Sequence, residues 1–166
     1  FIPTGGVNAQ NLAEYISAPF IHAVGGSWVC PKADITAGNV EKITALCKEA
    51  RRSILGFEVA HIGINCPDAD ASAAVCDTLN AAFGFETKLG NSSNFSTPAI
   101  EVMKTNYLGE KGHIAIRTNR IDVAIAELEK AGYAVDPETA KYKGDRMIAV
   151  YLKQEFGGFA VHLLQK

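Results

Sequence analysis

An internal repeat is the feature of this sequence that most restricts its fold. The segment His61-Ile62-Gly63-Ile64 recurs 52 positions later as His113-Ile114-Ala115-Ile116. In both copies the side chains alternate in the way expected for a strand with one face on an apolar core. A helical pattern follows each copy, over residues 70–83 and from Asn119 onward, and a glycine suits the end of each helix. The repeat predicts two copies of one strand–helix unit.

Each copy continues into further strands. The first helix leads into residues 85–89 and then into a closing strand at 98–103. The second leads into 133–135, an extra strand at 147–152 and a closing strand at 158–164. The first copy therefore reads as β-α-β-β, one strand short, and the second as β-α-β-β-β. We expect an α+β domain over residues 57–166, built from these two modules.

Residues 1–55 follow a different pattern of strand, helix, strand and helix. Helices are expected over 9–17, with Asn8 as N-cap, and over 39–54, and a short buried strand over 20–24. Two such units cannot cover both faces of a parallel sheet. The chain also opens on what reads as the inside of a strand, without Met. We therefore expect residues 1–55 to be the end of a longer barrel, truncated at its start and joined to the repeat domain by a flexible linker at Gly56.

Four polar residues interrupt the apolar strands at positions related by the repeat. His61 and His113 lie in the opening strands, and Glu101 and His162 in the closing strands. A buried imidazole or carboxylate is costly without a partner. The residues can satisfy one another by binding a divalent cation, and this donor set suits Fe(II), Zn(II), Ni(II), Co(II) or Mn(II). The alternative is a degenerate site that keeps the residues and binds no metal.

The second part resembles the vicinal oxygen chelate superfamily of glyoxalase I, extradiol dioxygenases and bleomycin-resistance proteins. Four segments that contain these residues carry the resemblance: Ala60-His61-Ile62-Gly63-Ile64, Ala99-Ile100-Glu101-Val102, Gly112-His113-Ile114-Ala115-Ile116 and Gly158-Phe159-Ala160-Val161-His162-Leu163. The resemblance implies a paired-module fold and a dimer. It implies metal ligands at His61, Glu101, His113 and His162, although the last position is often Glu in that superfamily. Asn65 and Arg117 share strand faces with His61 and His113, so they are candidates for binding a carboxylate or phosphate.

The first part resembles the end of the 2-keto-3-deoxy-6-phosphogluconate aldolase family, Schiff-base enzymes on a (β/α)8 barrel. The similar segments are Phe1-Ile2-Pro3-Thr4-Gly5-Gly6-Val7 and Ala23-Val24-Gly25-Gly26-Ser27-Trp28. Loops after the last two barrel strands commonly bind phosphate through backbone N–H groups. The resemblance thus implies a phosphate site at Thr4, Gly5, Gly6, Gly25, Gly26 and Ser27. It places the catalytic lysine before Phe1, so we expect this chain alone to lack aldolase activity.

Charge and composition narrow the functional classes further. The formal net charge is −2, which gives no electrostatic sign of a nucleic-acid or membrane partner. The four cysteines form no Cys-x-x-Cys pair, and reduced thiols in a cytoplasmic protein are expected. We expect a homo-oligomer acting on a keto acid or sugar-acid phosphate: a piece of a carbon–carbon lyase with an appended metal-binding domain. The alternatives are an independent metal-dependent glyoxalase or dioxygenase, and a non-catalytic module for metabolite binding or dimerisation.

Overall fold

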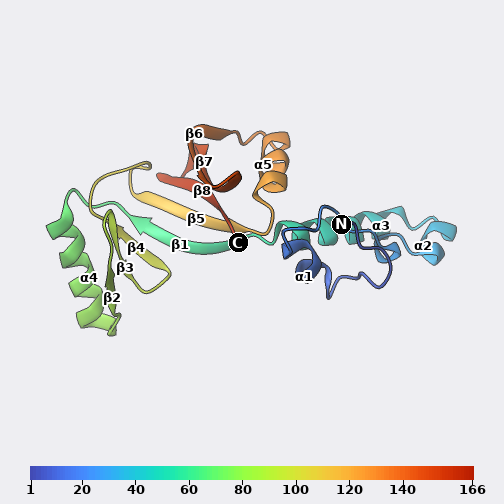
Figure 1. The fold of residues 1–166 in the computed structure, drawn as a ribbon, viewed down its shortest axis with the longest axis horizontal. Coiled ribbons are helices and arrows are strands. Elements are labelled where there is room, and N and C mark those ends of the chain that lie inside the picture. The colour runs from blue at the N-terminus through green and yellow to red at the C-terminus, as the bar shows by residue number, and fades with distance from the viewer.

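The computed structural model describes residues 1–166 and has two parts (Figure 1). One end of the molecule holds α1 (Leu12–Ser17), a 3-10 turn η1 (Ser27–Val29), α2 (Lys32–Thr36) and α3 (Val40–Leu55). The other end holds a single eight-stranded sheet with two helices. No helix in the structure combines the length and the hydropathy that crossing a bilayer requires.

In the first part, the expected parallel pairing of strands is limited to two hydrogen bonds and one bridge. The backbone N–H of His22 donates to Phe1 O at 2.9 Å and that of Gly25 to Pro3 O at 3.0 Å, and a parallel bridge joins Thr4 to Gly25. This is all that forms of the strand expected over 20–24, which is not a regular strand in the structure. The reason is physical: the segment has a single neighbour, and parallel strands are stable when buried within a larger sheet.

One helix of this part begins later than expected, and the short helix α2 was not expected from the sequence. The first starts at Leu12 rather than residue 9, because the Asn8 side chain accepts hydrogen bonds from the backbone of Gln10 and Asn11 in a turn that precedes the helix. The helix expected over 39–54 is confirmed as α3. It ends at Leu55 and is followed by Gly56, whose φ of 52° is the left-handed conformation that favours glycine after a helix.

The repeat domain consists of two modules with identical element order. The first comprises β1 (Glu58–Ile64), α4 (Ala69–Phe83), β2 (Thr87–Leu89), β3 (Ser93–Ser96) and β4 (Ile100–Met103). The second comprises β5 (Gly112–Thr118), α5 (Ile121–Lys130), β6 (Val135–Lys143), β7 (Arg146–Phe156) and β8 (Phe159–Gln165). The sheet order β2-β3-β4-β1-β5-β8-β7-β6 is symmetric about the β1–β5 pair. The α+β fold with paired modules is thereby confirmed, and the missing strand of the first module is a correction: β3 supplies it.

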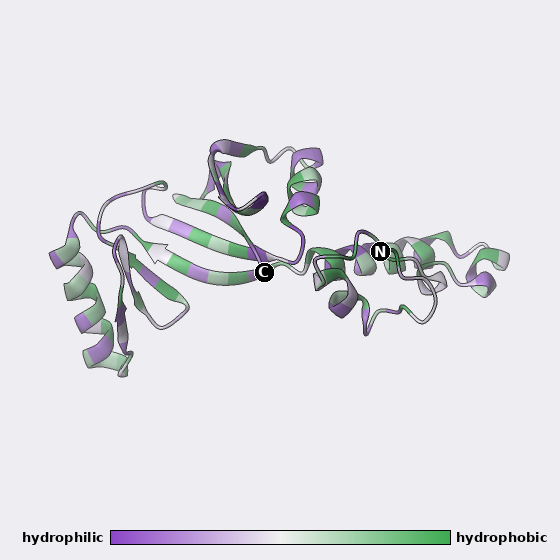
Figure 2. Ribbon diagram, viewed as in Figure 1, coloured by the Kyte–Doolittle hydropathy of each residue, from purple (hydrophilic) through white to green (hydrophobic).

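The two faces of the sheet have different roles. On one face α4 packs its Cys76 against Cys66 and Val102, and α5 packs over Val150 and Leu163, which gives each module its own apolar core. Side chains alternate along a strand, so the histidines of β1, β5 and β8 lie on the opposite face. The alternating colours along β1 and β5 in Figure 2 follow this pattern.

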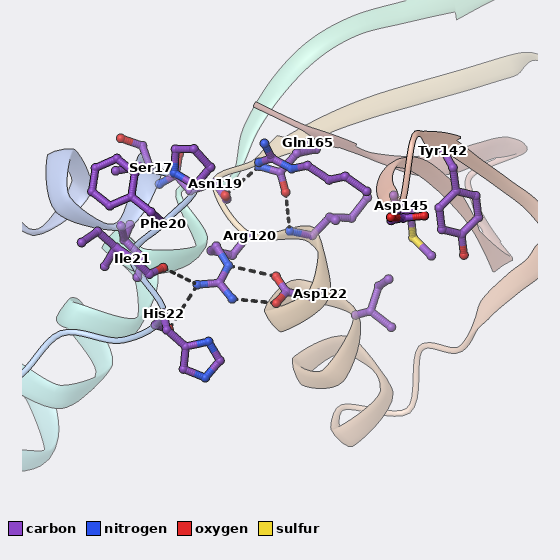
Figure 3. A pocket seen from close by; sticks show the side chains of 17 residues that line it. Ser17, Phe20, Ile21, His22, Asn119, Arg120, Asp122, Tyr142, Asp145 and Gln165 are labelled. Carbon is purple, nitrogen blue, oxygen red and sulfur yellow. Dashed lines mark hydrogen bonds and ion pairs between the residues drawn. The ribbon is translucent and has the colours of Figure 1, made fainter. Parts of the chain in front are cut away.

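The two parts meet at the start of α5. The guanidinium of Arg120 pairs with Asp122 and also donates to the carbonyl oxygens of Ile21 and His22 at 3.5 and 3.4 Å (Figure 3). The Thr118 hydroxyl donates to Leu55 O at 2.6 Å, next to Gly56. Gly56 is thus a helix end fixed to the sheet and not a flexible connection.

Candidate metal centre

The strand register of the four central strands brings the predicted ligands together. On β1, Gly63 lies opposite His113 of β5 and beside Glu101 of β4. His61 lies opposite Ala115, which in turn lies beside His162 of β8. All of these side chains therefore project from one face of the sheet, two from each module.

Three donor atoms form a compact triangle. Glu101 Oε2 lies 3.0 Å from His61 Nε2 and 3.1 Å from His113 Nε2, and these two nitrogens are 3.1 Å apart. His162 completes the group, since one nitrogen from each of the three histidines lies within 4.8 Å of the others. Its ring centroid is 5.0 Å from that of His113. This arrangement is the one inferred from the repeat.

Small residues make room for the imidazoles. A β-carbon at Gly63 would lie 2.0 Å from Cε1 of His113, so the ring occupies the space that any larger residue would need. Ala115, between His61 and His162, is fully buried. The glycine of the first repeat strand is therefore a steric requirement of the site.

Two buried imidazole nitrogens have no hydrogen-bond partner. His113 Nδ1 and His162 Nε2 are both enclosed and unpaired, in side chains that are 3% and 8% exposed. Buried polar atoms in folded proteins are nearly always satisfied, and an unpaired one costs about 1–3 kcal/mol. His113 already turns its Nε2 toward Glu101, so the unpaired Nε2 of His162 is the atom that a further group among these donors would complete.

The protonation states of two side chains suit metal binding. Burial, with the neighbouring His113 and His61, lowers the pKa of His162 to about 3, so its ring is neutral at pH 7. Burial alone would raise the pKa of Glu101, but hydrogen bonds with His113, His61 and Ser93 outweigh it and keep that pKa well below its usual range. Neutral imidazole and ionised carboxylate are the forms that bind divalent ions.

Three neighbours of the ligands were not identified from the sequence. The Ser93 hydroxyl donates to Glu101 Oε1 at 2.5 Å, and the Phe95 ring meets His61 edge-on at 5.7 Å. Tyr151 stacks on His162 with centroids 4.6 Å apart, and burial raises its pKa to about 12. Ser93 and Phe95 belong to β3, the strand that was not expected in the first module, so no sequence signal connected them with the site.

A cleft of about 770 Å³ reaches the site from one side. Its walls combine His61 and the cations Arg117 and Lys88 with apolar side chains such as Phe85 and Leu164. Arg117 also lies 3.8 Å from Glu58. Asn65 does not line this cleft: its amide nitrogen donates to the carbonyls of Tyr107 and Gly109, in the loop between the modules.

The expected phosphate-binding residues lie in two adjacent loops of the first part. Thr4 bridges to Gly25, so the loop containing Gly5 and Gly6 starts beside the loop containing Gly26 and Ser27. Gly5 and Gly6 have φ of 83° and 72° and open space where a β-carbon would be.

Gly26 has a second, structural reason to be glycine. A β-carbon there would lie 1.9 Å from the ring of Trp28, which packs across it. Ser27 is the first residue of the short 3-10 turn that carries this tryptophan.

Comparison with known proteins assigns a family likeness to the first part. The family model described as KDPG and KHG aldolase matches residues 1–46. Residues 1–46 are aldolase-like. The 2-dehydro-3-deoxy-phosphogluconate aldolase of Treponema pallidum is 47% identical over 49 residues, which are 30% of this chain and 23% of that protein. The Pseudomonas aeruginosa enzyme of the same name is 44% identical over 50 residues. The chain thus spans about a quarter of the length of these relatives.

Solved structures similar to the chain include methylmalonyl-CoA epimerases. That of Mycobacterium tuberculosis is 14% identical with a TM-score of 0.46, covering 68% of this chain and 89% of its own. That of Streptomyces coelicolor is 17% identical with a TM-score of 0.45, covering 65% and 96%. The assignment of the paired-module fold rests on the strand order described above.

Proposed function

We propose that residues 57–166 bind one divalent metal ion through His61, Glu101, His113 and His162. The observation that carries this proposal is the buried, unpartnered Nε2 of His162 beside a compact triangle of donor atoms. When bound, such an ion polarises ligand oxygens as a Lewis acid. The protein supplies the neutral and anionic donors and excludes water from the buried side of the site.

The spacing of the donors suits a single ion. The triangle of 3.0, 3.1 and 3.1 Å brings two imidazole nitrogens and one carboxylate oxygen close enough to share it. His162 adds a third imidazole to this set. Imidazole with carboxylate suits Fe(II), Mn(II), Co(II), Ni(II) and Zn(II).

The proposed ligand is a small anionic molecule with two neighbouring oxygen atoms. The cleft presents Arg117 and Lys88 for a carboxylate or phosphate, against apolar walls that include Phe95. Asn65 is the weaker candidate for ligand binding, because its amide nitrogen already donates to Tyr107 O and Gly109 O outside the cleft. The reactions that fit are a metal-dependent isomerisation or lyase reaction of the glyoxalase kind.

Metal analysis tests this function directly. After dialysis against Fe(II), Mn(II) or Co(II) and gel filtration, we expect about one ion per chain by elemental analysis. His113→Ala should remove it. His22→Ala is the matched control, because His22 is an exposed histidine outside the site and this variant should keep the ion. A metal-free protein with an intact fold would favour the second candidate, a non-catalytic metabolite-binding or dimerisation module.

For the whole protein we propose a lyase that cleaves 2-keto-3-deoxy-6-phosphogluconate or 4-hydroxy-2-oxoglutarate. Its support is the aldolase-like sequence of residues 1–46. In this proposal the loops at Thr4, Gly5 and Gly6 and at Gly25, Gly26 and Ser27 bind the substrate phosphate. The division at Gly56 then separates an aldolase part, residues 1–55, from a metal-binding part, residues 57–166. Borohydride treatment with pyruvate should leave this chain unlabelled, and a covalent adduct would show that it carries a Schiff-base lysine.

Assembly and location remain expectations. The apolar side chains of Phe83 and Leu89 are 68% and 77% exposed at the outer end of the first module, which supports a homo-oligomer. Light scattering on the purified chain measures this: a monomeric mass would contradict it. The four free cysteines fit a reducing compartment such as the cytoplasm.

A further inference from the structure

We propose that Ser93 is a positioning residue that restricts Glu101 to a single metal-binding oxygen and thereby leaves a coordination position for the ligand. This inference rests on the proposed metal site and concerns how that site accepts a chelating molecule. It gives a role to the strand β3, which the sequence pattern does not reveal.

The two oxygens of Glu101 have separate partners. Oε2 faces the Nε2 atoms of His61 and His113 at 3.0 and 3.1 Å. Oε1 accepts the Ser93 hydroxyl at 2.5 Å. A hydroxyl-to-carboxylate bond of this length is charge-assisted and among the stronger hydrogen bonds in proteins. Ser93 is 7% exposed, so water does not compete well for its hydroxyl.

This division of the carboxylate determines how many positions remain open. An octahedral ion has about six positions, and a carboxylate can occupy one or two of them. Three imidazoles and one carboxylate oxygen leave two positions, which is what a ligand with two neighbouring oxygens requires. A carboxylate that turned to bind through both oxygens would leave one. Rotation of that kind would break the bond from Ser93 to Oε1.

Hydrogen bonds on the other face of β3 hold Ser93 in place. On the other face of β3, Asn94 is 2% exposed and donates to the Ser72 hydroxyl of α4 at 3.1 Å. Ser72 in turn donates to Val102 O at 3.0 Å, on the strand that carries Glu101. The strand of the serine and the strand of the carboxylate are therefore both fixed to one helix.

The strand also contains its own control. Ser96 is a fully buried serine of β3, three positions on, and its hydroxyl has no partner. Residues 93 and 96 lie on opposite faces of the strand, so Ser96 faces away from Glu101. Ser96→Ala therefore makes the same chemical change at the same depth without touching the metal ligands.

The test uses Co(II) as a spectroscopic probe in the full chain. Co(II) affinity and visible absorption are recorded for the unchanged protein, Ser93→Ala, Ser93→Thr and Ser96→Ala, and each is then titrated with oxalate, which chelates, and with fluoride, which does not. We expect Ser93→Ala to keep about one Co(II) but to bind oxalate at least about tenfold more weakly, with a changed absorption spectrum and unchanged fluoride affinity. Ser93→Thr, which retains a hydroxyl, should restore oxalate binding, and Ser96→Ala should match the unchanged protein.

The outcomes separate this inference from the proposed function. If the unchanged protein binds no Co(II), the metal function is wrong. If Co(II) binds and Ser93→Ala takes up oxalate as well as the unchanged protein, only the role of Ser93 is wrong. Loss of Co(II) itself from Ser93→Ala would also overturn it, because the serine would then support metal binding rather than the open position.

Discussion

The imidazole of His113 lies over Gly63 of the neighbouring strand, in the space that a β-carbon at position 63 would fill. These two residues face each other across the pair β1 and β5, which lies at the centre of the eight-stranded sheet. The same register brings Glu101 beside Gly63 from the other side. A glycine in the first module thus allows the second module to place its histidine within reach of the carboxylate.

Gly63→Ala should therefore disrupt the site more than the fold. The added methyl group would lie 2.0 Å from His113 Cε1, so the ring must turn away from Glu101. We expect metal affinity to fall by about 10–100-fold, as for other changes that misplace a ligand, with the far-UV circular dichroism unchanged. Ile62→Ala is the control, because Ile62 projects from the opposite face and is 44% exposed. Unchanged affinity in Gly63→Ala would mean that His113 is not a ligand.

His162→Phe should have opposite effects on stability without and with metal, because His162 destabilises the fold when its nitrogen is unpaired and stabilises it when the nitrogen binds an ion. The buried Nε2 of His162 has no partner, and an aromatic ring can keep the stacking on Tyr151. In EDTA, removing an unsatisfied polar atom worth about 1–3 kcal/mol should raise the melting temperature of the variant above that of the unchanged protein.

With metal bound, the unchanged protein should have the higher melting temperature of the two. An ion at about 100 times its Kd stabilises a folded protein by about 2.7 kcal/mol, which is about 5–10 °C for a chain of this size. In differential scanning fluorimetry, added metal should raise the melting temperature of the unchanged protein by this amount and that of His162→Phe by less. Equal gains in both proteins would exclude His162 as a ligand.

The repeat was sufficient to predict most of the domain and four residues that meet in it. Period-two alternation shows which side chains share a face of a strand, so His61, His113, Glu101 and His162 could be related before any contact was known. What alternation does not reveal is the register between strands. The contacts of Ser93 and Tyr151 with these ligands depend on register, and they appear only in the folded chain.

Two segments show what a local sequence pattern cannot predict: one strand was missed, and one expected strand did not form. β3 was missed because the stretch from Gly84 to Glu101 leaves little room for a further strand, yet Ser93, Asn94 and Ser96 form one and all three are buried. Hydrogen bonds to α4 and Glu101, distant in the sequence, stabilise it. The apolar segment 20–24 was expected to be a buried strand, yet Phe20 is 63% exposed, because too few neighbouring strands are present to cover it.

Asp122→Asn should weaken the junction between the two parts, and the effect should depend on pH. The hydrogen bond from Arg120 lowers the pKa of Asp122 below its ordinary value of 3.8. The unfolded chain therefore takes up this proton at a higher pH than the folded chain does. The contribution of the pair is complete above about pH 4–5 and is lost as the pH falls through the lowered pKa of the folded state.

We accordingly expect the melting temperature of Asp122→Asn to be lower than that of the unchanged protein at pH 7 and to approach it near pH 3. Hydrogen exchange should also become faster around residues 21 and 22, whose carbonyls accept from Arg120. Asp145→Asn is the control, because Asp145 lines the same pocket as Asp122 and Arg120 (Figure 3) and forms no ion pair. A constant difference at all pH values would contradict a contribution from the ionised carboxylate.

Leu55→Ala should show that the two parts unfold together. Leu55 is the last residue of α3, but it is buried in the core of the second module with Ile121, Val150 and Leu163. Truncating a buried leucine typically costs about 2–5 kcal/mol. We expect a loss of this size in the free energy of unfolding from urea denaturation, with the tryptophan signal of the first part and the far-UV signal of the sheet shifting to the same lower midpoint. Val40→Ala, at the exposed start of the same helix, should change the free energy by less than about 0.5 kcal/mol. If the tryptophan midpoint moved and the sheet midpoint did not, the helix end would not belong to the core of the sheet domain, and the parts would be separate folding units.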